Sequence, residues 1–194
     1  MNTFSHIRMA MEINRTIGRI LNIRLDTARF VLGNIKPDFC PSLIKIPHLK
    51  EASFDFVASE IRELMAQKFS GGQSITNSFS ERLGVLTHYL ADFFCHAHAK
   101  SFTSGSIRHF IYEARLNGFI KRYPRSAAFH NFSGFTGSNA DPKSICGFLN
   151  RLHLNYESKR PSFARDYIYS LRACTALAVS VVSSCMPAGL ELAA

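Results

Sequence analysis

The sequence predicts an all-α fold, built as a single domain of six or seven helices over residues 1–194. Apolar residues recur at helical spacing through most of the chain, and no stretch of useful length alternates as a β-strand would. A length of 194 residues suits one domain, and a hydrophobic content of 46% with 17 phenylalanines can supply a sizeable core.

The first predicted helix follows Ser5, which we assign as its N-cap, and its apolar face runs from Ile7 to Leu25. Asp26 then caps a short turn that ends at Gly33. Regular helix is disfavoured over the next segment because it contains three prolines: Pro37, Pro41 and Pro47.

The remaining helices are predicted from the same periodicity. Their expected ranges are 51–69, 78–100, 107–119, 142–156 and 162–184. Segments 70–74 and 123–141 are rich in Ser, Gly and Asn and are expected to be loops. The most apolar stretch, 173–186, is too short and too polar for a membrane span, so we expect a buried final helix.

The net charge of +9 is compatible with a phosphate-bearing partner, such as nucleic acid, anionic lipid or a phosphoester, and equally with a solubilising surface. The cysteines are odd in number, widely spaced and free of any CxxC, which argues against a disulfide framework. Because the N-terminal segment also lacks the apolar core of a signal peptide, we expect a cytoplasmic protein.

Histidine and carboxylate pairs carry the chemical signal. His88 and Asp92 are four residues apart, as are His109 and Glu113, and such residues differ by about 40° in direction on a helix. An imidazole and a carboxylate on one face can chelate a divalent metal, and this ligand set suits zinc. One such pair describes a surface ion pair equally well, whereas two pairs near another histidine favour a metal site.

The third histidine of this region is ambiguous on spacing alone. His96 continues the stripe of His88 and Asp92, whereas His98 lies about 120° from Asp92 on an ideal helix. Periodicity therefore favours His96 as the co-ligand.

The pattern resembles the bacterial zinc-dependent phospholipases C, whose fold is shared by the zinc-dependent single-strand nucleases. The phospholipase motif is His-Tyr-Leu-Gly-Asp, five residues, then His, and this chain has His88-Tyr89-Leu90-Ala91-Asp92, five residues, then His98. A His-x-x-x-Glu motif follows in both. An early histidine and a Gly-x-x-x-Pro-Asp motif before a later histidine are matched in this chain by four residues: His6, Gly33, Asp38 and His48.

The resemblance implies a set of metal ligands in residues 5–113. His48, His88 and Asp92, with Asp38, would hold the first zinc, and His98, His109 and Glu113 the second. His6 would contribute to a third, with Asp92 bridging, and Asp38 is the candidate general base. The resemblance thus selects His98 over His96, which requires the helix to end or bend after Phe94.

Two departures from the family matter. The secreted phospholipase binds its third zinc through an N-terminal Trp, and this chain has no Trp, so a third metal requires that the Met1 or Asn2 terminus reach the site. Phe39 stands where the phospholipase has a Tyr in its choline pocket, so the resemblance does not extend to choline specificity. Secretion, as in the better-known members, is the alternative localisation.

Three functions follow as hypotheses. The first is a zinc-dependent phosphoester hydrolase of the phospholipase C type, acting on a phospholipid or other phosphodiester with peripheral membrane contact. The second is a nuclease or nucleotide phosphatase with nucleic acid as substrate, for which base-stacking aromatics are expected. The third is a non-enzymatic, metal-stabilised binding protein. The candidate stacking residues are Phe39, Phe129, Phe132 and Phe135.

Overall fold

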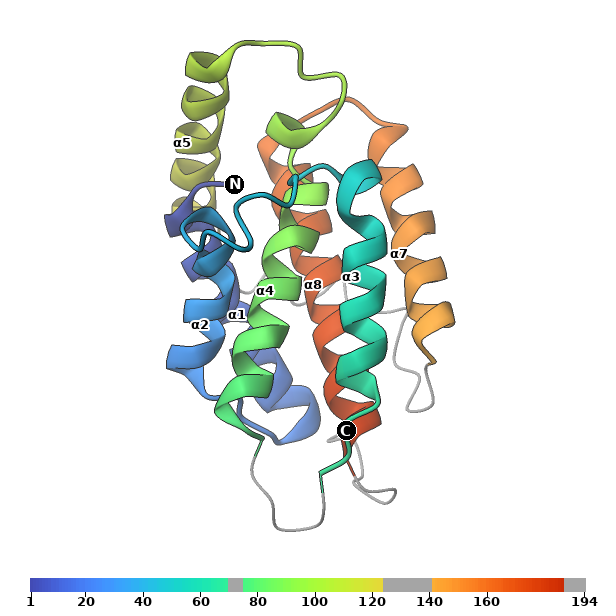
Figure 1. The fold of residues 1–194 in the computed structure, drawn as a ribbon. Helices are drawn as coiled ribbons and strands as arrows, with labels where there is room; N and C mark the ends of the chain where they lie inside the picture. The colour runs from blue at the N-terminus through green and yellow to red at the C-terminus, as the bar shows by residue number, and fades with distance from the viewer. Residues whose placement is uncertain (70–74, 124–140, 187–194) are drawn as a thin grey trace.

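In a computed structural model, described over residues 1–69, 75–123 and 141–186, the chain forms a bundle of α-helices (Figure 1). The helices are α1 (Thr3–Leu21), α2 (Thr27–Ile35), α3 (Lys50–Met65), α4 (Asn77–Phe93), α5 (Ser106–Arg122), α7 (Pro142–Glu157) and α8 (Phe163–Cys185), with 3-10 helices η1 (Lys36–Asp38) and η2 (His96–His98). These ranges contain no strand, which confirms the all-α prediction. The predicted loop 70–74 and most of the loop 123–141 lie outside the described residues.

Helices α4 and α8 form the centre of the bundle, and the other helices pack around them (Figure 1). Nearly every residue of α4 from Phe79 onward is buried, because the helix contacts α1, α2, α3 and α8. The buried polar side chains of this helix, among them His88 and Asp92, are therefore held in a dry setting, where unpaired charge is costly.

The first helix differs from its prediction at both ends. Its N-cap is Asn2, whose side chain accepts a hydrogen bond from the Ser5 backbone, so the assignment of Ser5 as N-cap is wrong. Asn22 ends the helix in the left-handed conformation, with a φ of 52° that asparagine tolerates well. The predicted Asp26 cap is present, but it begins a helix of nine residues, α2, where a short turn was expected.

Helix α4 is shorter than predicted, and the difference matters for the site. The periodic pattern continues to residue 100, yet α4 ends at Phe93 and the backbone of Cys95 is extended before η2 begins. This confirms the helix end that the choice of His98 required.

Helix α8 is long and apolar enough to cross a membrane by length and composition alone. In the bundle, however, 72% of its most apolar window is buried against the other helices. The prediction of a buried final helix agrees with this burial.

Candidate metal centre

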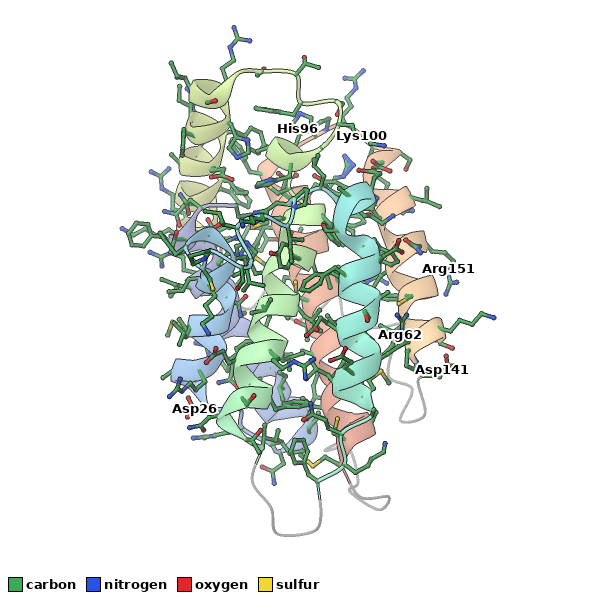
Figure 2. All side chains as sticks on the ribbon, in the orientation of Figure 1. Asp26, Arg62, His96, Lys100, Asp141 and Arg151 are labelled. Atoms are coloured by element: carbon green, nitrogen blue, oxygen red, sulfur yellow. The ribbon has the colours of Figure 1, made fainter. Side chains whose placement is uncertain are left out.

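The predicted site residues converge at one end of the bundle, where α1 and α5 begin, α2 and α4 end, and the segment 39–49 crosses (Figure 1). Figure 2 shows His96 and Lys100 at this end and Asp26 toward the opposite end. Nitrogen and carboxylate oxygen atoms lie within 4.8 Å of one another in four overlapping groups. These groups are His6–His88–Asp92, Asp38–His48–His88, His48–Asp92–His98 and His98–His109–Glu113. Together they contain all eight residues that the sequence predicted.

Asp92 is the hub of these groups and is fully buried. Its Oδ1 lies 3.3 Å from His6 Nε2 and 3.6 Å from His98 Nε2. Its Oδ2 lies 3.0 Å from His48 Nδ1 and 3.5 Å from His88 Nε2. One carboxylate therefore faces four imidazoles, two from each oxygen, which is the geometry needed to bridge neighbouring cations.

The ring orientation of His88 is fixed by a hydrogen bond to a backbone carbonyl group of α2. Nδ1 of His88 lies 2.7 Å from the carbonyl oxygen of Asn34. Because a carbonyl only accepts, Nδ1 carries the proton and Nε2 keeps its lone pair, 3.5 Å from Asp92 Oδ2 and 3.7 Å from Asp38 Oδ1. Such an outer partner is typical of histidines that ligate metals.

The second group lies on the other side of Asp92. Oε1 of Glu113 is 3.1 Å from His98 Nε2 and 3.0 Å from His109 Nε2. His109 and Glu113 share one face of α5, as their spacing predicted, and η2 brings His98 to them across the bend after α4. Three ligand atoms thus point at one position.

The α-amino group of Met1 also enters the site. It contacts Asp92 Oδ1 and lies 2.9 Å from His98 Nε2 and 3.1 Å from Glu113 Oε1. The Met1 nitrogen therefore lies among the side chains that the resemblance assigns to the metals. The positive charge of this ammonium lies between Asp92, His98 and Glu113, which are side chains proposed to coordinate a metal cation.

For His88, Asp92 and Glu113, the electrostatics favour the protonation states that bind metals. Burial holds the pKa of His88 well below its usual value. Burial would raise the pKa of Asp92, yet His98 and the Met1 amine hold it well below its usual value. Burial would also raise the pKa of Glu113, but the hydrogen bond with His98 lowers it to about 2. Neutral imidazoles and ionised carboxylates are the forms that coordinate zinc.

Unsatisfied buried atoms supply an independent test of fit. Both ring nitrogens of His6 and Nε2 of His88 are buried without a hydrogen bond. Their rings stack at 3.9 Å between centroids, inside the groups that contain Asp92. Leaving such atoms unpaired costs about 1–3 kcal/mol each, and a metal ion would satisfy the nitrogens that face it. The donor set of imidazole nitrogen and carboxylate oxygen fits zinc.

Other residues of the region have different roles. The His96 ring packs against Phe102 and Tyr112 and belongs to none of the ligand groups, so the periodicity argument for it is wrong. For Cys95 the sequence favours a small buried hydrophobe over a metal ligand, and in the structure this residue is buried and free.

From the sequence, two further histidines, His130 and His153, are expected to be loop or surface residues rather than ligands. His153 is buried on α7, and its Nε2 lies 2.9 Å from the carbonyl oxygen of Phe93, so the surface interpretation of this residue is wrong. It belongs to none of the ligand groups. His130 lies outside the described residues.

Asp166 is a supporting residue that sequence reasoning missed. This fully buried carboxylate accepts hydrogen bonds from the His96 backbone at 3.0 Å and from the hydroxyls of Tyr112 and Tyr156, each at 2.8 Å. It thereby joins α8 to η2, which carries His98, and to α5, which carries Glu113. In the sequence, Asp166 stands out only as the acidic residue in the first turn of an apolar helix. An acid at this position is also common where a helix simply begins, so it did not indicate a supporting role.

Comparison with known proteins agrees with this geometry. A family model described as zinc dependent phospholipase C matches residues 5–163, which extends the resemblance beyond residue 113 to the end of α5 and through α7. No curated protein and no solved structure matches the chain. The family match covers most of the chain and contains all eight converging residues. The chain therefore belongs to the zinc-dependent phospholipase C family.

Proposed function

We propose that the protein hydrolyses the phosphodiester bond of a phospholipid, releasing the phosphorylated head group and leaving the alcohol on the lipid. Family membership supports a zinc-dependent hydrolase of the phospholipase C type. The observation that carries the proposal is the convergence of eight predicted ligands around Asp92.

The groups can accommodate two or three zinc ions. Asp38, His48 and His88 with Asp92 would hold one ion, as the sequence proposed. The set His98, His109 and Glu113 would hold a second. His6 and the Met1 amine, both in contact with Asp92, support a third position. Bound zinc polarises phosphoryl oxygens and lowers the pKa of nearby water.

Asp38 is proposed as the base that orients and deprotonates the attacking water. Its side chain is about one quarter exposed, at 24%, whereas Asp92 is fully buried, so Asp38 is the carboxylate that water can reach. The Thr3 hydroxyl lies 3.5 Å from its Oδ2 and steadies it. Burial raises the pKa of Asp38, and a base whose pKa lies closer to neutrality is the stronger proton acceptor.

In the proposed hydrolysis, one bond to phosphorus forms as another breaks. The water oxygen forms a bond to phosphorus, the bond from phosphorus to the lipid oxygen breaks, and the proton of the water passes to Asp38. The released lipid oxygen takes up a proton from solvent, and Asp38 returns its proton to solvent. His48 and His109 are partly exposed beside Asp38 and Glu113, so the substrate phosphate enters from their side of the centre.

From the sequence, Lys36, Lys45 and Lys100 are candidates to attract an anionic substrate, with an ordinary solvated surface charge as the alternative for each. Lys36 pairs with Glu81, which neutralises it locally. Lys45 and Lys100 are exposed, and Lys100 lies 3.9 Å from Glu51. Lys45 is therefore the best candidate for this role. Among the proposed stacking aromatics Phe39 is exposed beside Asp38, and Phe129, Phe132 and Phe135 lie outside the described residues.

The test is metal analysis of the purified protein, followed by assays on a dispersed short-chain phospholipid and on single-stranded DNA. Two or three zinc ions per chain and release of the phosphorylated head group are expected. Absence of bound zinc after reconstitution would overturn the proposal. Cleavage of DNA alone would establish the nuclease, and bound zinc with neither substrate cleaved would establish the metal-stabilised binding protein.

Asp38→Asn tests the assignment of the base. This variant should retain its zinc, because the amide oxygen can still serve as a ligand in place of the carboxylate oxygen, and should lose turnover by about two to four orders of magnitude, because an amide cannot accept the proton. Asp55→Asn on α3 is the matched control, since Asp55 is an exposed carboxylate outside the ligand groups. Equal activity of the two variants would remove Asp38 from the mechanism.

A further inference from the structure

Exposed apolar side chains are concentrated around the metal centre. Among the described residues, seven of the nine large exposed hydrophobic side chains lie within four residues of a proposed ligand. We call these seven the apolar rim: Phe4, Phe39, Ile44, Leu49, Ile107, Phe110 and Ile111. The two others, Met11 on α1 and Leu154 on α7, are farther from any ligand in the sequence. Exposed apolar residues that gather at one place indicate an interaction surface, whereas scattered ones do not.

The apolar rim comes from three segments that meet at one end of the bundle. These are the first turns of α1, the crossing segment 39–49 and the first turns of α5 (Figure 1). The exposed fractions are high, at 66% for Phe4 and Phe39, 77% for Ile107 and 70% for Phe110. Within the described residues, these side chains are not covered by another part of the chain.

The same segments carry the ligands that reach the surface. Asp38, His48 and His109 have side-chain exposures of 24%, 18% and 30%, whereas Asp92 is fully buried. A substrate phosphate that approaches these exposed ligands therefore meets segments that also carry the apolar rim. A protein partner seated on this rim would cover that approach, so the favoured occupant is one that contains the substrate.

The charge of the rim segments is also one-sided. Residues 2–8, 39–50 and 104–112 contain no aspartate or glutamate, although the whole chain has 14. Their cationic residues include Arg8, Lys45 and Arg108, all of them exposed. Apolar side chains interleaved with cations match a surface of acyl chains beneath phosphate head groups.

We propose that the apolar rim inserts into the surface of a phospholipid bilayer and presents the head group of a lipid to the metal centre. The proposal rests on the proposed function, since it names the physical form in which that site meets its substrate. Phe4, Phe39 and Phe110 bury their rings among the acyl chains, and the neighbouring cations bind phosphates.

The experiment measures binding separately from turnover. Zinc-loaded protein is floated with vesicles of mixed zwitterionic and anionic phosphonate lipids, in which carbon replaces the oxygen that hydrolysis would release. The triple variant Phe4→Ser/Phe39→Ser/Phe110→Ser should partition onto these vesicles at least about tenfold more weakly, because three aromatic rings no longer leave water. Zinc content and melting temperature establish that the variant is folded.

Leu154→Ser is the matched control. Leu154 is as exposed as Phe4 and Phe39, at 66%, and it lies on α7 outside the rim segments. This variant should bind vesicles as the wild type does. Equal loss in both variants would show general surface hydrophobicity and would overturn the proposal, as would a triple variant that binds normally.

Two further outcomes are distinguishable. The wild-type protein could hydrolyse dispersed short-chain phospholipid and yet fail to float with vesicles. That result would overturn the rim proposal and leave the proposed function intact. A protein that floats through the rim but hydrolyses no dispersed phosphodiester sinks the proposed function and leaves the rim. If light scattering shows a dimer that the triple variant loses, without vesicle binding, the rim is a protein interface and the proposal is wrong.

Discussion

Gly33 of α2 and Gly84 of α4 lie directly against each other, so closely that a Cβ atom on Gly84 would stand 2.9 Å from the Cα of Gly33. The same Cβ would stand 2.3 Å from the carbonyl oxygen of Phe30, and a Cβ on Gly33 would stand 2.0 Å from that of Glu81. Only glycine allows this approach. It brings the end of α2 close enough for the Asn34 carbonyl to meet His88, and so sets the geometry of the metal centre from one turn away.

Gly84→Ala should therefore destabilise the fold and weaken metal binding together. The added methyl group meets backbone atoms that cannot move aside cheaply, and we expect a loss of about 3 kcal/mol in the free energy of unfolding. Urea denaturation and zinc titration measure the two effects. Gly118→Ala on α5 is the control, because its Cβ would meet nothing within 4 Å and should be neutral or stabilising. Similar losses in both variants would contradict the close-contact argument.

Replacing one buried histidine at a time separates ligation from packing. His88→Gln removes a nitrogen that faces Asp92 and should lower the zinc content by one ion per chain. His153→Gln changes an equally buried imidazole that contacts the Phe93 carbonyl instead, and it should keep the full zinc content. Atomic absorption on the purified variants gives the count. Full zinc in His88→Gln would mean that the centre is misassigned.

Asp166→Asn tests whether the carboxylate on α8 holds the second ligand group in place. An amide can no longer accept from both the His96 backbone and the Tyr112 hydroxyl at Oδ2 while also accepting from Tyr156 at Oδ1. Outer-shell changes of this kind reduce metal affinity by about 10- to 100-fold. Competition with a chromophoric chelator should show this loss for one zinc ion only.

Tyr156→Phe is the companion variant for Asp166. It removes the hydrogen bond to Oδ1 and leaves the contact with the His96 backbone in place. It should therefore cost stability but little zinc affinity. If both variants change zinc affinity equally, or neither changes it, Asp166 acts on the core and does not position the centre.

Acid should destabilise the metal-free protein in a defined range. The unfolded chain protonates His88 near pH 6.5, whereas in the folded chain burial holds its pKa well below that value. The unfolded state therefore binds more protons, and the contribution of His88, present above pH 6.5, is lost as the pH falls toward the folded pKa. The slope for this group approaches about 1.4 kcal/mol per pH unit as the pH falls below 6.5. Denaturation curves between pH 7 and 5.5 measure it, and His88→Gln should flatten the profile. An unchanged slope in that variant would assign the acid sensitivity to other groups.

Helical periodicity predicted the all-α class and the approximate position of each helix, because a buried face repeats wherever a helix packs on a core. It also placed His109 beside Glu113, and His88 beside Asp92, since both relations are contained within one helix. The family motif supplied the order of the remaining ligands, which the structure brings together.

The end of α4 was beyond the reach of periodicity. The apolar pattern runs on past Phe93, but the bend lets the His96 backbone donate to Asp166, seventy residues later in the chain. Local helix propensity does not depend on a partner so distant in the sequence, so it could not predict this bend. This bend removes His96 from the ligand groups and brings His98 into them, against the spacing on an ideal helix.

The sequence by itself thus determined the helices, the ligand types and the two ligand pairs that lie within single helices. The tertiary structure decided how these parts meet: the glycine contact between α2 and α4, the Asp166 network, the approach of the Met1 amine to Asp92 and the apolar rim at the end of the bundle. The physical reason is that ligand convergence and surface exposure depend on packing between segments distant in sequence, whereas periodicity reports only on the element that contains it.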